Sequence, residues 1–139
     1  MNIVMDTNVV VSGLITPYGS AAEIVRMVAA GDMSVCYDAR ILSEYRQVLA
    51  RPKFKLRPEA VAHVLAQVEA GGLLITPQPL PISLLDRDDE PFLAVAIAGQ
   101  AMGLITGNKR HYPYAACQNI PVVSPAEFIE FYRRFKGKG

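Results

Sequence analysis

Asn2-Ile3-Val4-Met5-Asp6 is a short apolar run that ends in a carboxylate, and the pattern it sets recurs along the chain. An apolar run without polar alternation predicts a strand buried on both faces of a parallel sheet. Open α/β sheets bind ligands beyond the carboxyl ends of their strands. We therefore expect Asp6 at the rim of a sheet. The competing interpretation is that Asp6-Thr7-Asn8 only forms a turn.

Apolar runs alternate with amphipathic segments along the rest of the sequence. We expect strands at residues 2–5, 33–37, 73–76, 104–106 and 121–123. Helices are expected at 21–30 with Ser20 as N-cap, at 39–49, from 58 to Gly71, from Asp88 or Asp89 to Gly103, and from 124 to about 135. A loop is expected between Asp6 and Ser20. This order predicts an α/β fold, a three-layer α/β/α sandwich with a mostly parallel, roughly five-stranded central sheet, as a single domain over residues 1–139.

The bulk composition limits the classes of function. The chain has 139 residues, of which 51% are hydrophobic, so we expect one globular domain with a real core. A net charge of +1 provides no global attraction for nucleic acid, so any such binding needs a local patch. Cys36 and Cys117 are isolated, which disfavours a zinc or disulfide framework and favours the cytoplasm. We expect no signal peptide, and the apolar stretch 92–105 is too short to span a membrane.

Carboxylates recur at the ends of the expected elements. Glu44 shares a helix face with the apolar residues Ile41 and Val48, where a carboxylate must reach solvent, pair with Arg40 or Arg46, or bind a metal. We keep these interpretations open. If the sheet brings Glu44 close to Asp6, the repulsion between like charges predicts a cation between them.

Asp86, Asp88 and Asp89 precede an expected helix, where acids are favoured by capping and by the helix dipole. Asp88 suits that purpose, while the spacing of Asp89 to the apolar residues after it directs it toward the sheet. We choose Asp89 as the metal ligand, and Asp86 either shapes the loop or adds a ligand. Asn108 follows an apolar strand and either offers a carbonyl oxygen to a metal or favours a left-handed turn. Hard oxygen ligands select Mg²⁺ or Mn²⁺ over zinc, and therefore indicate phosphate chemistry.

Lys109, Arg110, His111 and Tyr112 come directly after Asn108. A short basic run is usually a solvated surface, but this one would stand where phosphates arrive, with Tyr112 or Tyr114 able to stack on a base. We predict RNA binding by these four residues. No dinucleotide-binding glycine pattern, Walker A sequence or nucleophile elbow is present in the sequence.

These residues, in this order, resemble the PIN-domain family of metal-dependent nucleases. The resemblance runs through Val4-Met5-Asp6-Thr7-Asn8-Val9, Leu42-Ser43-Glu44-Tyr45, the segment 86–94 and Thr106-Gly107-Asn108-Lys109. It implies that Asp6, Glu44 and Asp89 are catalytic and metal-binding, with Thr7, Asn8 and Thr106 in support. The fourth acidic position of many members falls on Asn108, and Asp86 is the residue that compensates.

The resemblance also implies a Mg²⁺- or Mn²⁺-dependent endoribonuclease. Small members of the VapC-like group are toxins of toxin–antitoxin pairs, so an RNA substrate, an antitoxin protein and a homodimer are the expected partners. Two alternatives stay open. One is a metal-dependent phosphatase, although a haloacid-dehalogenase-type enzyme would carry an Asp where this chain has Asn8. The other is a catalytically inactive RNA-binding or regulatory module, which Asn108 makes plausible.

Overall fold

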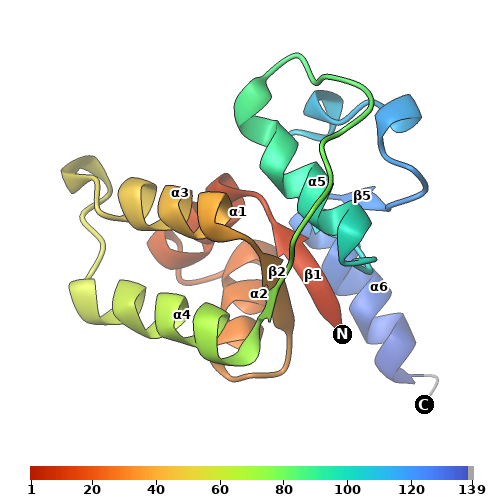
Figure 1. Ribbon diagram of the computed structural model, residues 1–139. Helices are drawn as coiled ribbons and strands as arrows, with labels where there is room; N and C mark the ends of the chain where they lie inside the picture. Colours follow the sequence, from red (N-terminus) through yellow and green to blue (C-terminus); the bar gives the residue numbers. More distant parts are fainter. Residues whose placement is uncertain (138–139) are drawn as a thin grey trace.

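A five-stranded parallel sheet with helices on both faces forms the protein, as the sequence predicts (Figure 1). The structure is a computed structural model and describes residues 1–137. The strands are β1 (Asn2–Met5), β2 (Ser34–Tyr37), β3 (Leu73–Leu74), β4 (Leu104–Ile105) and β5 (Val122–Val123). The α-helices are α1 (Thr7–Ile15), α2 (Ser20–Ala29), α3 (Ala39–Leu49), α4 (Pro58–Gly71), α5 (Glu90–Ala98) and α6 (Pro125–Gly137). Four 3₁₀ turns connect them, η1 (Pro52–Phe54), η2 (Arg87–Asp89), η3 (Lys109–His111) and η4 (Tyr114–Ala116).

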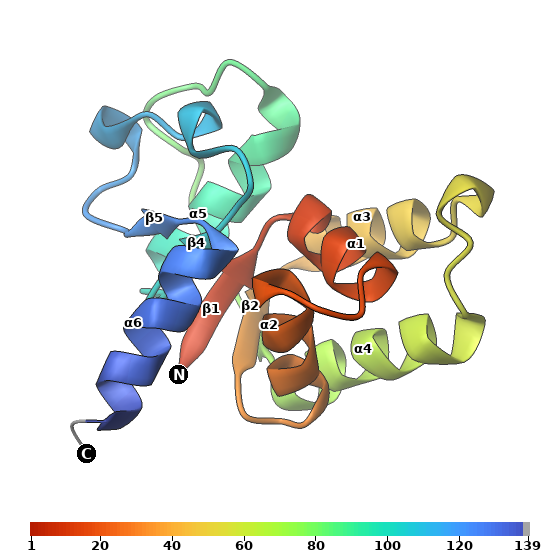
Figure 2. The same cartoon turned by 180° about the vertical axis from the view of Figure 1, so that it is seen from behind.

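The strand order is β3-β2-β1-β4-β5, and every neighbouring pair is parallel. The register pairs Ile3 with Val35 on one side of β1 and Met5 with Ile105 on the other. These central strands are buried because α5 covers one face of the sheet while α2 and α6 cover the opposite face (Figures 1 and 2). Continuous apolar runs are what a sheet covered on both sides requires. Within residues 1–137, no helix combines the length and the apolar character needed to cross a membrane.

The expected loop after Asp6 is wrong, because α1 begins directly at Thr7. Gly13 lies inside this helix rather than in a turn. A Cβ atom at Gly13 would stand 2.4 Å from Val25 Cγ2 and 2.7 Å from the Ala21 carbonyl oxygen, so the missing side chain lets α1 and α2 approach closely. A glycine that serves helix packing looks in the sequence like a helix breaker, which explains the error.

Several boundaries also differ from the sequence-based expectation. Ser20 is the first residue of α2 rather than its cap, and the N-cap position belongs to Gly19, whose φ of +104° suits glycine. α5 ends at Ala98 instead of Gly103, and β3 ends at Leu74 instead of residue 76. At the start of α6 a capping box forms, since the Glu127 N–H donates to Ser124 Oγ and the Ser124 N–H donates to Glu127 Oε1.

Candidate active site

The candidate site lies where the chain connections of the sheet reverse direction. β2 and β3 lie on one side of β1, and β4 and β5 lie on the other, so β1 and β4 flank the topological switch point. Asp6 directly follows β1 and Thr106 directly follows β4. The Thr106 hydroxyl donates a hydrogen bond of 2.9 Å to Asp6 Oδ2. The first carboxylate identified in the sequence therefore lies where open α/β sheets bind ligands.

Asp6 is held by groups that lie far from it in the sequence. It occupies the N-cap position of α1, yet its side chain makes no capping hydrogen bond. The side chain is only 7% exposed, and the Tyr112 hydroxyl lies 3.4 Å from the same Oδ2 atom that Thr106 contacts. The interpretation of Asp6 as a local turn residue is therefore wrong.

Glu44 reaches the same region from α3. It is half-buried, and the Thr7 hydroxyl donates a hydrogen bond to Glu44 Oε2. Because Thr7 follows Asp6, this contact ties α3 to the junction of β1 and α1. Arg40 and Arg46 pair with other acids, so the interpretation of Glu44 as an arginine partner is wrong.

Asp89 enters from the start of α5 and is 8% exposed. Its side chain makes no capping hydrogen bond, and the expected cap is provided by Asp86, whose Oδ1 accepts the Asp88 N–H at 2.9 Å. His111 Nδ1 lies 3.0 Å from Asp89 Oδ2, an ion-pair distance when the imidazole is protonated. The contact is not aligned as a hydrogen bond, so within residues 1–137 the buried Oδ2 has no hydrogen-bond partner.

Burial and mutual repulsion raise the pKa of two of these acids. Loss of hydration raises the pKa of Glu44, the Thr7 hydrogen bond lowers it in part, and the charge of Asp6 raises it again. Loss of hydration also raises the pKa of Asp89, with Asp6 adding to the effect and His111 opposing it. Asp6, Glu44 and Asp89 therefore share one electrostatic neighbourhood.

The donor set suits a hard divalent cation, although the ligands do not converge on one point. Within residues 1–137, no group of three or more His, Cys, Asp or Glu side chains is gathered closely enough to hold a metal ion. The expectation that three carboxylates surround one ion is therefore not met in this conformation. Mg²⁺, however, commonly binds through one or two carboxylates and keeps several waters. Asp6 and Asp89, with the unpartnered Asp89 Oδ2, fit such an open site, and Glu44 lies beside them.

The two additional ligand candidates are not brought into this cluster. Asp86 is exposed and its carboxylate caps η2. Asn108 is exposed as well, and its backbone N–H donates to Thr106 Oγ1 at 3.0 Å. Of the expected supporting residues, Thr7 and Thr106 each donate to a site carboxylate, whereas Asn8 points into a neighbouring cavity.

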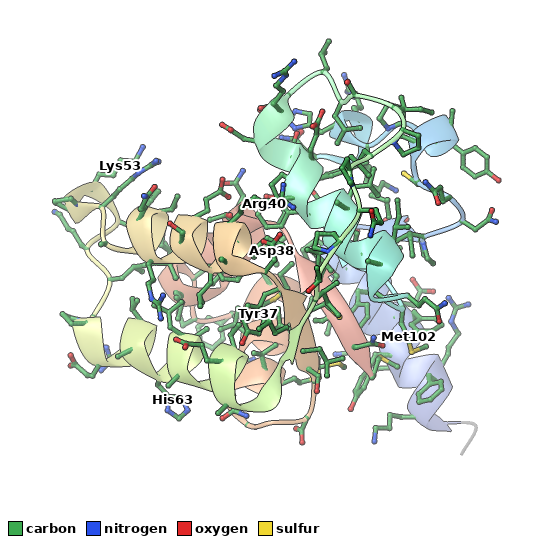
Figure 3. All side chains as sticks on the ribbon, in the orientation of Figure 1. Tyr37, Asp38, Arg40, Lys53, His63 and Met102 are labelled. Carbon is green, nitrogen blue, oxygen red and sulfur yellow. The ribbon has the colours of Figure 1, made fainter. Side chains whose placement is uncertain are left out.

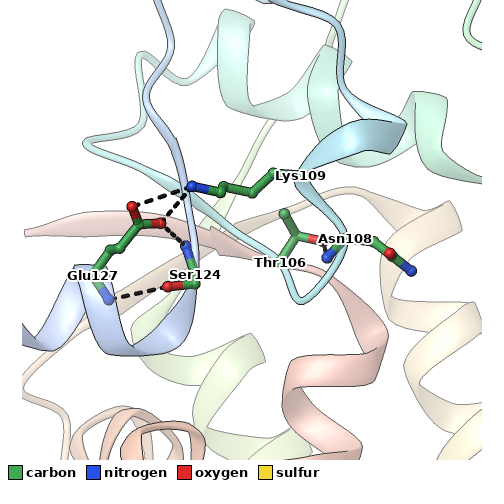
Figure 4. A network of polar contacts seen from close by, with 5 residues as sticks. All are labelled: Thr106, Asn108, Lys109, Ser124 and Glu127. Atoms are coloured by element: carbon green, nitrogen blue, oxygen red, sulfur yellow. Dashed lines mark hydrogen bonds and ion pairs between the residues drawn. The ribbon is translucent and has the colours of Figure 1, made fainter.

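The four residues of the expected RNA-binding run 109–112 lie in four different environments. Lys109 Nζ forms an ion pair of 2.9 Å with Glu127, and Figure 4 shows it directed toward α6 while Asn108 points away from that pair. Tyr112 is 4% exposed and contacts Asp6, so the expectation that its ring stacks on an RNA base is wrong. His111 lies against Asp89. Only Arg110 is both exposed and without an ion pair to a described residue.

A cavity of about 430 Å³ opens beside the carboxylates. It lies between α1, the segment before α2 and the start of α6, and its lining includes Asn8, Ser12, Tyr18, Gly107 and Ser124. Asn8 and Gly107 each directly follow a threonine that donates to a site carboxylate. Two residues that line the cavity are thus adjacent in the chain to residues of the site.

Sequence reasoning missed Tyr45. This tyrosine is fully buried on α3, one position after Glu44, and its hydroxyl donates a hydrogen bond of 2.5 Å to the Met5 carbonyl oxygen. It therefore anchors the end of β1 next to Asp6. Its helical spacing predicts only a buried core residue. No local signal in the sequence indicates that its hydroxyl contacts a strand forty residues away.

Comparison with known proteins agrees with this geometry. The family model described as PIN domain matches residues 2–110. The chain belongs to the PIN-domain family. PIN domains include VapC-like ribonucleases, and PIN-domain nucleases typically use divalent metals, so the resemblance seen in the sequence is confirmed at the level of the family.

A protein of similar length from an archaeon is similar in sequence. The chain is 27% identical over 146 residues to Uncharacterized protein MJ1680 of Methanocaldococcus jannaschii, a match that covers 97% of this chain and 94% of the relative. No solved structure matches the chain. The family membership of this PIN domain thus indicates a nuclease, and its substrate and partners remain to be proposed from its own residues.

Proposed function

We propose that this PIN domain is a Mg²⁺- or Mn²⁺-dependent endoribonuclease that acts in the cytoplasm. The observation that carries the proposal is the group of Asp6, Glu44 and Asp89 at the switch point of the sheet. Burial raises the pKa of Glu44 and Asp89, and Asp89 Oδ2 is buried without a hydrogen bond. Such an arrangement is unfavourable unless positive charge approaches it.

Each carboxylate has a distinct part in the proposed reaction. Asp6 is fixed by Thr106 and Tyr112. Asp89 Oδ2 lies 3.0 Å from His111 Nδ1 but accepts no hydrogen bond from a described residue. These two carboxylates would hold the cation. The cation, when bound, supplies positive charge that polarises a phosphoryl oxygen and stabilises the leaving oxygen. Glu44 is oriented by Thr7, and its raised pKa suits it to accept the proton of the attacking water. No covalent intermediate with the protein is required.

The test is the cleavage of RNA by the wild type and by Asp6→Asn, with Mn²⁺ or with a chelator. A matched control is Asp32→Asn, which makes the same change at an exposed aspartate between α2 and β2, at the opposite edge of the sheet. We expect cleavage by the wild type and by Asp32→Asn that stops with the chelator, and no cleavage by Asp6→Asn. Glu44→Gln should lose on the order of 100-fold or more in rate, the usual contribution of a general base.

Equal cleavage by Asp6→Asn and wild type would remove Asp6 from the site. An absence of metal-dependent cleavage in the wild type, with RNA binding retained, would favour the inactive RNA-binding module. That alternative draws support from Asn108, which supplies no fourth carboxylate and is exposed.

We further propose that the protein is the toxin of a toxin–antitoxin pair and forms a homodimer. The proposal is supported by its membership of a family that includes VapC-like ribonucleases and by the exposed apolar side chains of Phe131 and Phe135 on α6. Growth arrest on expression, relieved by co-expression of a neighbouring reading frame, tests the first part. The solution mass of the wild type and of Phe135→Glu tests the second, and a wild type that is monomeric at all concentrations would contradict it.

A further inference from the structure

The segment that joins α3 to α4 is strongly basic. Arg51-Pro52-Lys53-Phe54-Lys55-Leu56-Arg57, here called the basic loop, places four cations in seven residues without an acid. The whole chain has 14 Lys and Arg residues against 13 Asp and Glu residues. The basic loop is therefore a local positive patch on a protein that is nearly neutral as a whole.

All four cations of the basic loop are exposed, and none of them forms an ion pair with a described residue. By contrast, Arg46, Lys109 and Arg133 each pair with a glutamate. Lys53 Nζ lies 5.1 Å from the centroid of the Phe54 ring, so an aromatic side chain stands among the charges. Unpaired cations beside an aromatic ring are the arrangement that tracks a single nucleic-acid strand.

Two cavities meet at the basic loop. One of about 470 Å³ lies between α2 and α4, and its lining includes Arg26, Lys55, Arg57 and His63. The other, also about 470 Å³, lies between α3 and α4. Lys55 lines both cavities, and neither lining contains an acid.

Lys55 also has a left-handed backbone, with φ of +52°, at the C-cap position of η1. A lysine kept in this conformation, between two concave and acid-free surfaces, favours an anionic ligand.

The basic loop begins just beyond the end of α3, the helix that carries Glu44. Arg51 follows Glu44 by seven residues, and it lies two residues past Leu49, where α3 ends. The charge of Arg51 lowers the pKa of Glu44, in opposition to the larger effect of burial, so the two side chains share one field. Figure 3 shows Lys53 at the outer end of α3, while Asp38 and Arg40 mark its inner end. A strand that leaves the carboxylates along α3 would reach the basic loop within a few nucleotides.

We propose that the basic loop binds the phosphodiester backbone of single-stranded RNA whose reacting phosphate lies at Asp6, Glu44 and Asp89. This inference rests on the proposed function, and it moves the main RNA contact away from residues 109–112. There Lys109 is neutralised by Glu127, and Tyr112 is buried. Lys53, Lys55 and Arg57 contact phosphates and carry no base specificity.

The salt dependence of RNA binding tests the proposal. A fluorescent single-stranded RNA is titrated with protein in chelator, where no cleavage occurs, over a range of salt concentrations. The test variant is Lys53→Gln/Lys55→Gln/Arg57→Gln. The control Arg133→Gln/Arg134→Gln/Lys136→Gln removes the same charge from α6. Each lost contact with a single strand reduces the slope of log K against log salt by about 0.7, so we expect a loss of about 2 for the basic-loop variant and almost none for the control.

The outcomes separate this inference from the proposed function. If the wild type cleaves RNA but both triple variants keep the wild-type slope, the basic loop does not bind RNA and the nuclease assignment stands. If the wild type never cleaves RNA but the slope falls only in the basic-loop variant, the nuclease assignment fails and the RNA contact stands. Lys53→Gln alone provides a milder second variant, with an expected change of about 0.7. An unchanged RNA slope together with lost binding of polyglutamate would assign the surface to an acidic protein and overturn the inference.

Discussion

Replacing Tyr45 by Phe removes one oxygen atom from the interior and leaves the ring in place. The Tyr45 hydroxyl donates its hydrogen bond to the carbonyl oxygen of Met5, at the end of β1 and directly before Asp6. Burial, together with the negative charges of Asp6 and Glu44, holds the pKa of Tyr45 well above its usual value, so the hydroxyl stays a donor over the whole working range of pH.

The expected loss of stability follows from the hydrogen bond that the Met5 carbonyl oxygen loses. No cavity forms, so the main cost is a buried backbone oxygen without a partner, which is worth about 1–3 kcal/mol. For a chain of 139 residues, 1 kcal/mol lowers Tm by roughly 3–4 °C, so Tyr45→Phe should lower Tm by roughly 3–10 °C. The same loss frees the end of β1 and with it the backbone of Asp6. Since a displacement of about 1 Å in a catalytic group can cost as much as 100-fold in rate, RNA cleavage should fall by about tenfold.

The assay is thermal unfolding followed by circular dichroism, together with the rate of RNA cleavage at a temperature where both proteins are folded. Tyr37→Phe is the matched control, because Tyr37 is a buried tyrosine in β2 whose hydroxyl makes no hydrogen bond to a described residue. We expect Tyr37→Phe to retain both the stability and the activity of the wild type. Equal effects of the two substitutions would refute the assignment of the Met5 contact, and so would an unchanged Tm for Tyr45→Phe.

Three further predictions concern the site and its support. Burial raises the pKa of Asp89 in the folded protein, so between its ordinary and its raised pKa the folded state binds more protons, and the stability falls as the pH rises through the raised pKa. Asp89→Asn should therefore raise Tm at neutral pH in chelator and lose this advantage near pH 4, at about the ordinary pKa of aspartate, in a series of melting curves. Thr106→Val removes the hydroxyl that donates to Asp6, which should cost about 1.5–3 kcal/mol in denaturant unfolding and slow RNA cleavage. Gly72→Ala would place a Cβ atom 2.2 Å and 2.5 Å from two backbone oxygens and should destabilise by about 1–3 kcal/mol, whereas Gly107→Ala meets nothing within 4 Å and should be neutral on the same measurement.

The strands could be predicted because each is a continuous apolar run, and such runs have few uses outside a covered parallel sheet. β1 shows this most clearly, since its bounds agree at both ends. α1 could not be predicted, because a glycine such as Gly13 can either break a helix or allow two helices to pack closely. The sequence alone does not distinguish these two roles. Only the distance of Gly13 to Val25 and Ala21 in the fold shows which of the two applies.

The acidic residues of the site could be found because each follows or begins an expected element. Their neighbours could not, because the contacts of Thr106 and Tyr112 with Asp6 join segments about a hundred residues apart. The basic loop has a local sequence pattern, but this pattern alone does not predict RNA binding. Its alternation of cations with apolar residues is visible in the sequence, but only the fold shows that these cations lack ion pairs with described residues and that the charge of Arg51 acts on Glu44.

The polar contacts of the site explain why its carboxylates do not converge on one metal position. Asp6 is bound by Thr106, Glu44 by Thr7, and Asp89 lies against His111, so each acid has its own partner and is kept apart from the others. A cation would have to compete with these partners, and protein ligands alone would hold it weakly. Mg²⁺ in nucleic-acid enzymes is often held jointly by one or two carboxylates and by phosphates of the substrate. In the proposed function, the RNA on the basic loop would bring that phosphate to Asp6 and Asp89. Cation and RNA would then strengthen each other's binding by the same factor, as linkage requires.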